Sequence, residues 1–223
     1  MGRLMFLLIF GLTGAGILIS LGVWQVQRLA WKEGVLSEIE ARIDAAPVAL
    51  PETVDPEADR YLPVEVSGRF LPGEIHVLVS IKRVGPGFLI IAPFETETGR
   101  RILVDRGFVP SDAKAAPRTL GPETVTGNLH WPRETDSYTP DPDLEANTWF
   151  AREVPDMAAH LDTDEVLLIA RSETDPAIRP IPVDTAGIPN DHLQYAITWF
   201  SLAAIWIMMT ALFLWRSRAP RQA

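Results

Sequence analysis

Two long uncharged stretches dominate the distribution of apolar residues along the chain. They cover residues 4–27 and 193–215, which are 24 and 23 residues long. About 20 apolar residues are enough for a helix to cross the roughly 30 Å hydrocarbon core of a bilayer. The pattern therefore predicts transmembrane helices within residues 1–27 and 192–215, with a short tail at 216–223.

A cleaved signal peptide is the ordinary alternative for the first stretch. Its apolar core is too long for one, Arg3 is the only basic residue before it, and no small-residue cleavage motif follows it. A buried core helix can be equally apolar, but two such stretches at opposite ends favour membrane spans. The absence of an Arg-rich presequence favours a bacterial inner membrane over a mitochondrial one.

Between the two stretches, residues 28–191 contain short apolar segments broken by proline and glycine. Apolar and polar residues alternate at 62–66 and at 75–79, which is typical of strands with one buried face. The other short apolar segments are 87–94, 101–108, 125–129, 148–151 and 166–170. Turns are expected at Pro72-Gly73 and Pro86-Gly87. The pattern predicts an external β-rich domain, an antiparallel sandwich or barrel of the α+β class.

Other segments of this region have different patterns. Residues 28–46 resemble a helical extension of the first span, and residues 47–60, which are rich in proline and acidic residues, are expected to be a linker. Residues 132–146 are expected to form an exposed loop. A short helix is expected at 154–161.

The charges are distributed unevenly. All 29 acidic residues lie within residues 28–191, whereas four of the 20 basic residues lie outside: Arg3, Arg216, Arg218 and Arg221. The positive-inside rule then predicts that both termini are cytoplasmic and the domain periplasmic, although Arg28 and Lys32 lie on the opposite side. The net charge of −9 argues against a nucleic-acid-binding protein, which needs a basic face.

The sequence offers little catalytic chemistry. Cysteine is absent, which excludes thiol nucleophiles, disulfides and Cys-ligated metal centres. No nucleophile elbow, phosphate-binding loop, zinc-protease motif or dinucleotide fingerprint occurs. His76, His130 and His160 are isolated, and His76 lies on the polar side of its strand pattern, where we expect it to face solvent. We therefore do not expect an enzyme.

The more informative residues lie where the two predicted spans reach the outer surface. Trp24 and Arg28 should lie at a similar depth to His192, Tyr195 and Trp199. A histidine at this position could be an axial ligand to haem iron. Aromatic faces could pack the macrocycle, and Arg28 could pair with a propionate. The ordinary alternative is that the aromatic residues are interfacial anchors and His192 is part of a helix start.

Four segments carry a resemblance to a known family. They read LGVWQVQRLAWKEGVL at 21–36, YLPVEVSGRFLPGEIHVL at 61–78, GFLIIAPFETETGRRILVDRGFVP at 87–110 and NDHLQYAITWFSLA at 190–203. With its two spans and large external loop, the chain resembles the surfeit-locus (Surf/Shy-type) family of cytochrome c oxidase assembly factors. The resemblance covers nearly the whole chain. One departure is Asp105, where the family pattern leads us to expect Asn.

The resemblance implies a role in respiratory-chain biogenesis. It suggests a membrane chaperone that binds haem a at the outer membrane boundary and aids its insertion into the catalytic subunit of cytochrome c oxidase. His192 is then the best candidate for the iron ligand, with Trp24, Arg28, Tyr195 and Trp199 around the haem. The implied partners are the oxidase catalytic subunit, haem a synthase and the lipid bilayer.

Two alternatives stay open at this point. One is a cofactor-free scaffold that stabilises an oxidase assembly intermediate. The other is a tethered external hydrolase or binding module, for which no nucleophile motif is present. Gln25, Gln194 and Tyr195 are neighbours of His192 by position, and nothing in the sequence makes any of them a second iron ligand. Gly107, between Arg106 and Phe108, indicates a bulge or a positive φ.

Overall fold

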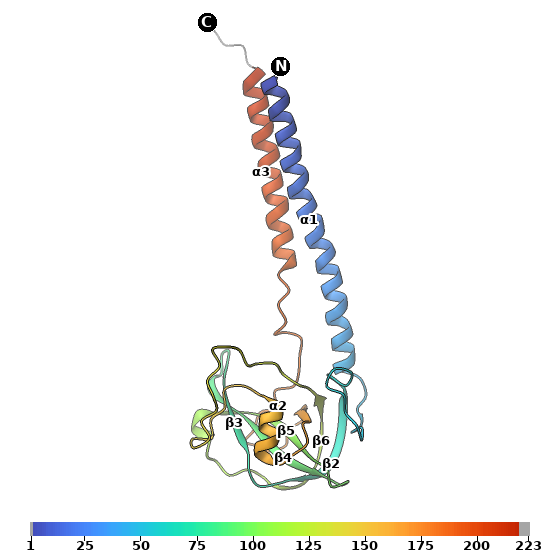
Figure 1. Ribbon diagram of the computed structural model, residues 1–223, viewed down its shortest axis with the longest axis vertical. Helices are drawn as coiled ribbons and strands as arrows, with labels where there is room; N and C mark the ends of the chain where they lie inside the picture. The colour runs from blue at the N-terminus through green and yellow to red at the C-terminus, as the bar shows by residue number, and fades with distance from the viewer. Residues whose placement is uncertain (1, 219–223) are drawn as a thin grey trace. The chain divides into compact units, whose positions relative to one another are not determined.

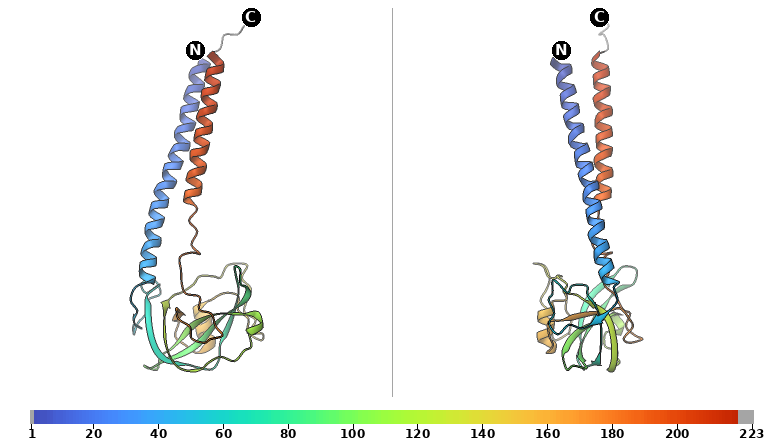
Figure 2. Two further views of the ribbon diagram at one scale, coloured as in Figure 1. Left: turned by 180° about the vertical axis from the view of Figure 1, so that it is seen from behind. Right: turned by 90° about the vertical axis from the view of Figure 1, so that its right-hand side faces the viewer.

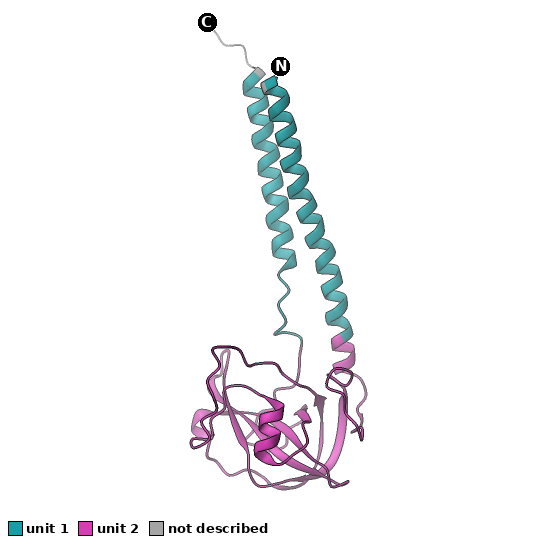
Figure 3. Ribbon diagram, in the orientation of Figure 1, with its two compact units in different colours: residues 1–38, 185–223 teal, residues 39–184 magenta. Residues whose placement is uncertain are grey.

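The computed structural model describes residues 2–218, which divide into two compact units (Figure 3). One unit combines residues 1–38 with 185–223, and the other comprises residues 39–184. The first consists mainly of two helices, whereas the second contains all the strands found among the described residues. Each unit is described separately below.

In the helical unit, α1 (Gly2–Ile43) and α3 (His192–Arg218) run antiparallel, side by side (Figures 1 and 2). Glycines on α1 receive large side chains of α3. A Cβ added to Gly14 would lie only 2.5 Å from the ring of Trp206. A Cβ added to Gly22 would meet the ring of Phe200 in the same way. The Trp206 Nε1–H also donates a hydrogen bond to the Gly11 carbonyl, at 2.9 Å. Small residues therefore allow the close helix approach typical of membrane-spanning pairs.

Both helices are long and apolar enough to cross a membrane. Their apolar windows, within Leu4–Ile43 and His192–Ser217, have mean hydropathies of 2.4 and 2.0. Only 11% and 6% of these windows are buried inside the protein, unlike the core helix of a soluble domain. The helix that begins with the first span continues without a break to Ile43.

The second unit is built on a single sheet. Its strands are β1 (Val48–Ala49), β2 (Pro63–Phe70), β3 (Ile75–Ile81), β4 (Gly85–Thr96), β5 (Arg101–Pro110), β6 (Gly121–Leu129) and β7 (Leu167–Ala170). The strand order is β1-β2-β6-β7-β5-β4-β3, and an additional pairing of β2 with β4 closes five strands into a ring. The expected β-rich domain between terminal helices is confirmed, and a closed barrel is its form.

Two large apolar clusters stabilise the barrel. The first takes residues from all five strands of the ring, such as Val64, Phe94 and Leu168, and therefore fills the interior. The second lies outside the ring, where α2 (Val154–Leu161) and β3 pack against β4, β5 and β7. Strand pairing is mostly antiparallel, but β1 with β2 and β5 with β7 are parallel pairs.

A bulge in β5 confirms the expectation for Gly107. Ile90 of β4 pairs with Gly107 and Ile91 pairs with Asp105, so Arg106 is the extra residue. Gly107 has a φ of +119°. A side chain is rarely tolerated there, which is why glycine follows Arg106.

Two local expectations are wrong. Residues 148–151 do not form a strand: Trp149 makes a single isolated bridge to Val77 and donates its backbone N–H to the His76 carbonyl at 2.8 Å. The Pro86-Gly87 pair lies within β4, and the preceding turn is formed by residues 82–84. A proline at the beginning of a strand pattern resembles a turn signal when register is unknown.

Candidate functional site

A polar pair joins the two helices of the helical unit. His192 is the first residue of α3, and its Nδ1 lies 2.7 Å from Oε1 of Gln25 on α1. The Gln25 side chain is nearly enclosed, with 8% of the residue exposed, whereas His192 is partly exposed. A partly exposed, hydrogen-bonded histidine therefore lies at the end of the paired segment.

The helix pairing explains why these two side chains meet. The backbone N–H of Tyr195 donates to the Asp191 carbonyl at 3.1 Å, which fixes the start of α3. Ala196 is 2% exposed and lies four residues after His192, on the same stripe of the helix facing α1. Gln25 follows Gly22 by three residues on the facing stripe of α1. The small residues thus bring the two helices close enough for a direct hydrogen bond.

The other predicted haem-contacting residues differ in their exposure and contacts. Trp24 and Tyr195 are 53% and 54% exposed, and Trp199 is partly buried. The guanidinium carbon of Arg28 lies 3.9 Å from the ring centre of Trp31, a residue expected at the same depth of the membrane boundary. These residues leave apolar and cationic surface free on the helical unit, while Gln25 is the residue in direct contact with His192. The sequence feature that could have identified Gln25 is an uncharged polar residue within an apolar span.

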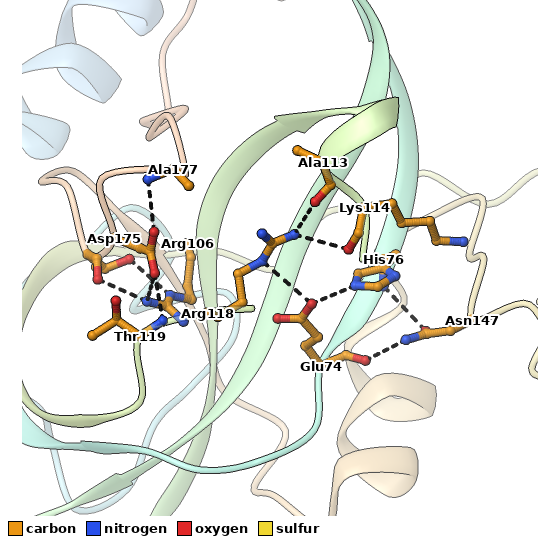
Figure 4. Close-up of polar contacts among 11 residues, drawn as sticks. Glu74, His76, Arg106, Ala113, Lys114, Arg118, Thr119, Asn147, Asp175 and Ala177 are labelled. Atoms are coloured by element: carbon orange, nitrogen blue, oxygen red, sulfur yellow. Dashed lines mark hydrogen bonds and ion pairs between the residues drawn. The ribbon is translucent and has the colours of Figure 1, made fainter. Parts of the chain in front are cut away.

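His76 was expected to face solvent, and this is wrong. It is 8% exposed, and its Nε2 lies 2.7 Å from Oε1 of Glu74. Asn147 closes over it, donating to the Glu74 carbonyl at 2.8 Å and accepting from the His76 backbone N–H (Figure 4). The segment before α2 therefore covers the face of β3 that the alternating sequence pattern had predicted to be exposed.

Arg118 extends this network across the β-rich unit. Its Nε lies 3.6 Å from Glu74 Oε1, and its Nη2 donates to the Ala113 and Lys114 carbonyls at 2.8 and 3.1 Å (Figure 4). Its side chain is only 4% exposed. The guanidinium ties the segment before β6 to β3, which is a structural role.

Another buried arginine, Arg106, lies inside the barrel. Arg106 follows Val104 on the interior side of β5 and stacks on Phe70, with its guanidinium carbon 4.0 Å from the ring centre. It donates to Thr174 at 3.1 and 2.9 Å and lies 3.7 Å from an Asp175 oxygen. Burial lowers the Arg106 pKa, and Asp175 opposes this shift. The pair anchors the loop after β7 to the barrel (Figure 4).

On the outer side of β5, Arg152 connects two carboxylates. Its Nη1 lies 3.0 Å from Asp105 Oδ2, and its Nη2 lies 2.5 Å from Glu134 Oε1. Asp105 also accepts the Gly107 backbone N–H at 3.0 Å and is fully enclosed. Burial raises the Asp105 pKa even though Arg152 opposes it. The residue that departs from the family pattern is thus part of a buried ion network.

His130 and His160 make aromatic contacts. The His130 ring stacks on Tyr61 with centroids 5.1 Å apart, and His160 meets Trp149 edge-on at 5.6 Å. Across residues 2–218, no group of three His, Asp or Glu side chains is arranged to hold a metal ion. The histidines of the β-rich unit therefore do not converge on a shared site in the described chain.

His130 makes a pH-dependent contribution to stability. Burial, with help from nearby Arg152 and Arg60, lowers its pKa to about 4. The unfolded chain binds a proton near pH 6.5 and the folded one does not, so stability falls as the pH drops from about 6.5 to 4. The full shift corresponds to about 3 kcal/mol, and we expect about 2 kcal/mol because the ring is partly exposed.

His130→Phe keeps the stacking on Tyr61 but cannot bind a proton. Chemical unfolding of both proteins at pH 7 and pH 4.5 measures the effect. The wild type should lose more stability than the variant on acidification. Parallel losses in the two proteins would contradict a neutral buried imidazole.

The fold and the polar pair together define a class of protein. In this class, a β-barrel domain is preceded and followed along the sequence by a helix able to span a membrane. The SURF1 family model matches residues 12–204 of the chain. The chain therefore belongs to the SURF1 family, which confirms the resemblance seen in its motifs.

Individual relatives agree with the family match. A SURF1-like protein of Monosiga brevicollis is 34% identical over 213 residues, covering 85% of this chain and 80% of the relative. Surfeit locus protein 1 of Rattus norvegicus is 30% identical over 223 residues, covering 89% and 71%. A bacterial SURF1-like protein, from Rickettsia felis, is 30% identical over 210 residues, covering 88% and 92%.

Proposed function

We propose that this protein is a membrane-bound assembly factor for cytochrome c oxidase that binds haem a through His192 and aids its insertion into the oxidase catalytic subunit. SURF1 proteins are known in general as assembly factors of this oxidase. Haem a is cargo in this proposal, so the chain needs a ligand that can release it and no catalytic group.

The observation that carries the proposal is the state of His192. One ring nitrogen, Nδ1, is engaged by Gln25, which leaves Nε2 as the nitrogen that could bind iron. The residue begins a helix that is able to span a membrane, so a bound hydrophobic macrocycle could remain beside the bilayer. Exposed Trp24 and Tyr195 offer aromatic surface nearby along the helices.

The proposed orientation rests on the charges. Basic residues at both ends and the acidic region between them support cytoplasmic termini and a periplasmic barrel in a bacterial inner membrane. His192 then lies at the outer, periplasmic boundary of the membrane. We propose the oxidase catalytic subunit as the recipient and haem a synthase as the donor, since cargo of this hydrophobicity requires transfer between membrane-bound partners.

The testing experiment is a visible absorption spectrum of the detergent-purified full chain, produced in cells that also make haem a. We expect bound haem a in the wild type and at least a tenfold lower haem content in His192→Ala, which is about 1.4 kcal/mol of binding free energy. His160→Ala is the matched control, because it removes an exposed imidazole from the β-rich unit.

Two outcomes oppose the proposal. Equal haem content in the wild type and His192→Ala would exclude His192 as the ligand. A folded wild type without haem would favour the cofactor-free scaffold, whose barrel holds an oxidase intermediate.

A further inference from the structure

We infer that Gln25 is the positioning residue of this site: it holds the His192 imidazole in the tautomer whose Nε2 lone pair is free to bind iron. The role in haem binding rests on the proposed function, but the tautomer is a property of the protein alone. It follows from the distance of 2.7 Å between Gln25 Oε1 and His192 Nδ1.

The chemistry of the two atoms fixes the direction of the hydrogen bond. The amide oxygen of Gln25 faces Nδ1 in the structure. An amide oxygen accepts hydrogen bonds and cannot donate them, so Nδ1 carries the proton in this arrangement. A neutral imidazole has one N–H, and Nε2 therefore keeps its lone pair. Histidine ligands of metals are commonly oriented by such a partner on the other ring nitrogen, which also increases the donor strength of the ligating nitrogen.

The burial of Gln25 supports the same conclusion. An amide enclosed in an apolar helix pair loses its hydration and needs a partner in the protein. Gln25 is 8% exposed, whereas Gln27 and Gln194, on the same two helices, are exposed. Gln25 therefore differs from the other two in being both enclosed and bonded to the histidine across the helix pair.

The direct test measures the tautomer without haem. The full chain, labelled with ¹⁵N-histidine, is studied in detergent by NMR at pH 8, with His192→Ala used to assign the signal. We expect His192 to be protonated mainly at Nδ1 in the wild type. Gln25→Leu removes the acceptor and should shift the population toward the Nε2-protonated form. Equal tautomer populations in the wild type and Gln25→Leu would overturn the inference, whatever the haem results.

A second measurement links the tautomer to ligation. Gln25→Leu should lower haem a affinity about 10- to 100-fold, the usual effect of losing such a partner. Gln25→Glu keeps an acceptor with a negative charge, so it should retain haem and lower the reduction potential of the iron. Gln27→Leu, an exposed change two residues away, should match the wild type.

The outcomes separate the two proposals. If the wild type and His192→Ala hold the same amount of haem, the proposed function fails, while the tautomer measurement still decides the role of Gln25. If His192→Ala loses haem but both Gln25 variants keep the wild-type affinity and potential, the positioning role fails and the ligand remains.

Discussion

Gly107→Ala is expected to destabilise the β-rich unit by roughly 3–5 kcal/mol. A φ of +119° costs a residue with a Cβ about 1–3 kcal/mol. The new Cβ would also lie 2.2 Å from the Arg179 carbonyl oxygen. Overpacking of this kind costs typically about 1–3 kcal/mol more, because backbone must move. Arg179 cannot move freely, since it exchanges hydrogen bonds of 2.7 and 2.9 Å with Phe108.

Gly85→Ala is the matched control for this prediction. Gly85 has a similar φ of +111°, but a Cβ built there meets nothing within 4 Å. We expect a loss of about 1–2 kcal/mol from the backbone conformation alone. Chemical unfolding of the two full-length variants in detergent, followed by tryptophan fluorescence, compares them. Equal losses would show that the approach of Arg179 has no energetic consequence.

The elements with strong periodicity could be predicted from the sequence. The two apolar stretches are helices, and the short helix was predicted at 154–161, where α2 lies. The strand patterns at 62–66 and 75–79 fall in β2 and β3, with errors of a few residues at their ends. The two spans could be predicted from their length and lack of charge. The strands could be predicted because burial on one face imposes a period that the local sequence records.

The errors arise where long-range contacts decide the structure. The two-residue strand β1 is too short for a pattern, and it exists through its parallel pairing with β2. The bridge at Trp149 and the burial of His76 both depend on the segment before α2 folding over β3. A polar residue on the outer side of a strand looks exposed until the chain that covers it is known.

The candidate site shows the same division. His192 and its aromatic neighbours could be selected from their place at the end of a span. The partner on α1 could not, because it depends on how the helices are rotated about their axes. That rotation is set by contacts such as Phe200 on Gly22, which bring Gln25 to face His192. The sequence therefore selects the proposed ligand, and the packing on glycines brings to it the residue that we propose orients it.

Arg152→Met is expected to destabilise the β-rich unit by about 3–5 kcal/mol, the usual result of leaving a buried charge without its partner. Asp105 is 2% exposed at its side chain and would keep only the Gly107 N–H as a hydrogen-bond partner among its described contacts. Glu134, with 37% side-chain exposure, can be hydrated instead. Most of the loss should therefore come from Asp105.

A double-mutant cycle isolates this contribution. Asp105→Asn, the residue expected from the family pattern, removes the buried charge but keeps an oxygen able to accept the Gly107 N–H. Arg152→Met should then cost about 2 kcal/mol less in the Asp105→Asn background than in the wild type. Chemical unfolding of the four full-length proteins at pH 7.5 measures the coupling. Additive losses would mean that Arg152 acts through its packing and not through the buried carboxylate.

The pH dependence of Arg152→Met gives an independent check on the same cause. Burial already raises the Asp105 pKa, and removing Arg152 takes away the main opposing interaction. A carboxyl group whose pKa is higher in the folded than in the unfolded state destabilises the fold increasingly as the pH rises above the unfolded value near 3.9. The loss caused by Arg152→Met should therefore be larger at pH 8 than at pH 5. A constant loss over this range would show that the carboxylate is not the group left unpaired.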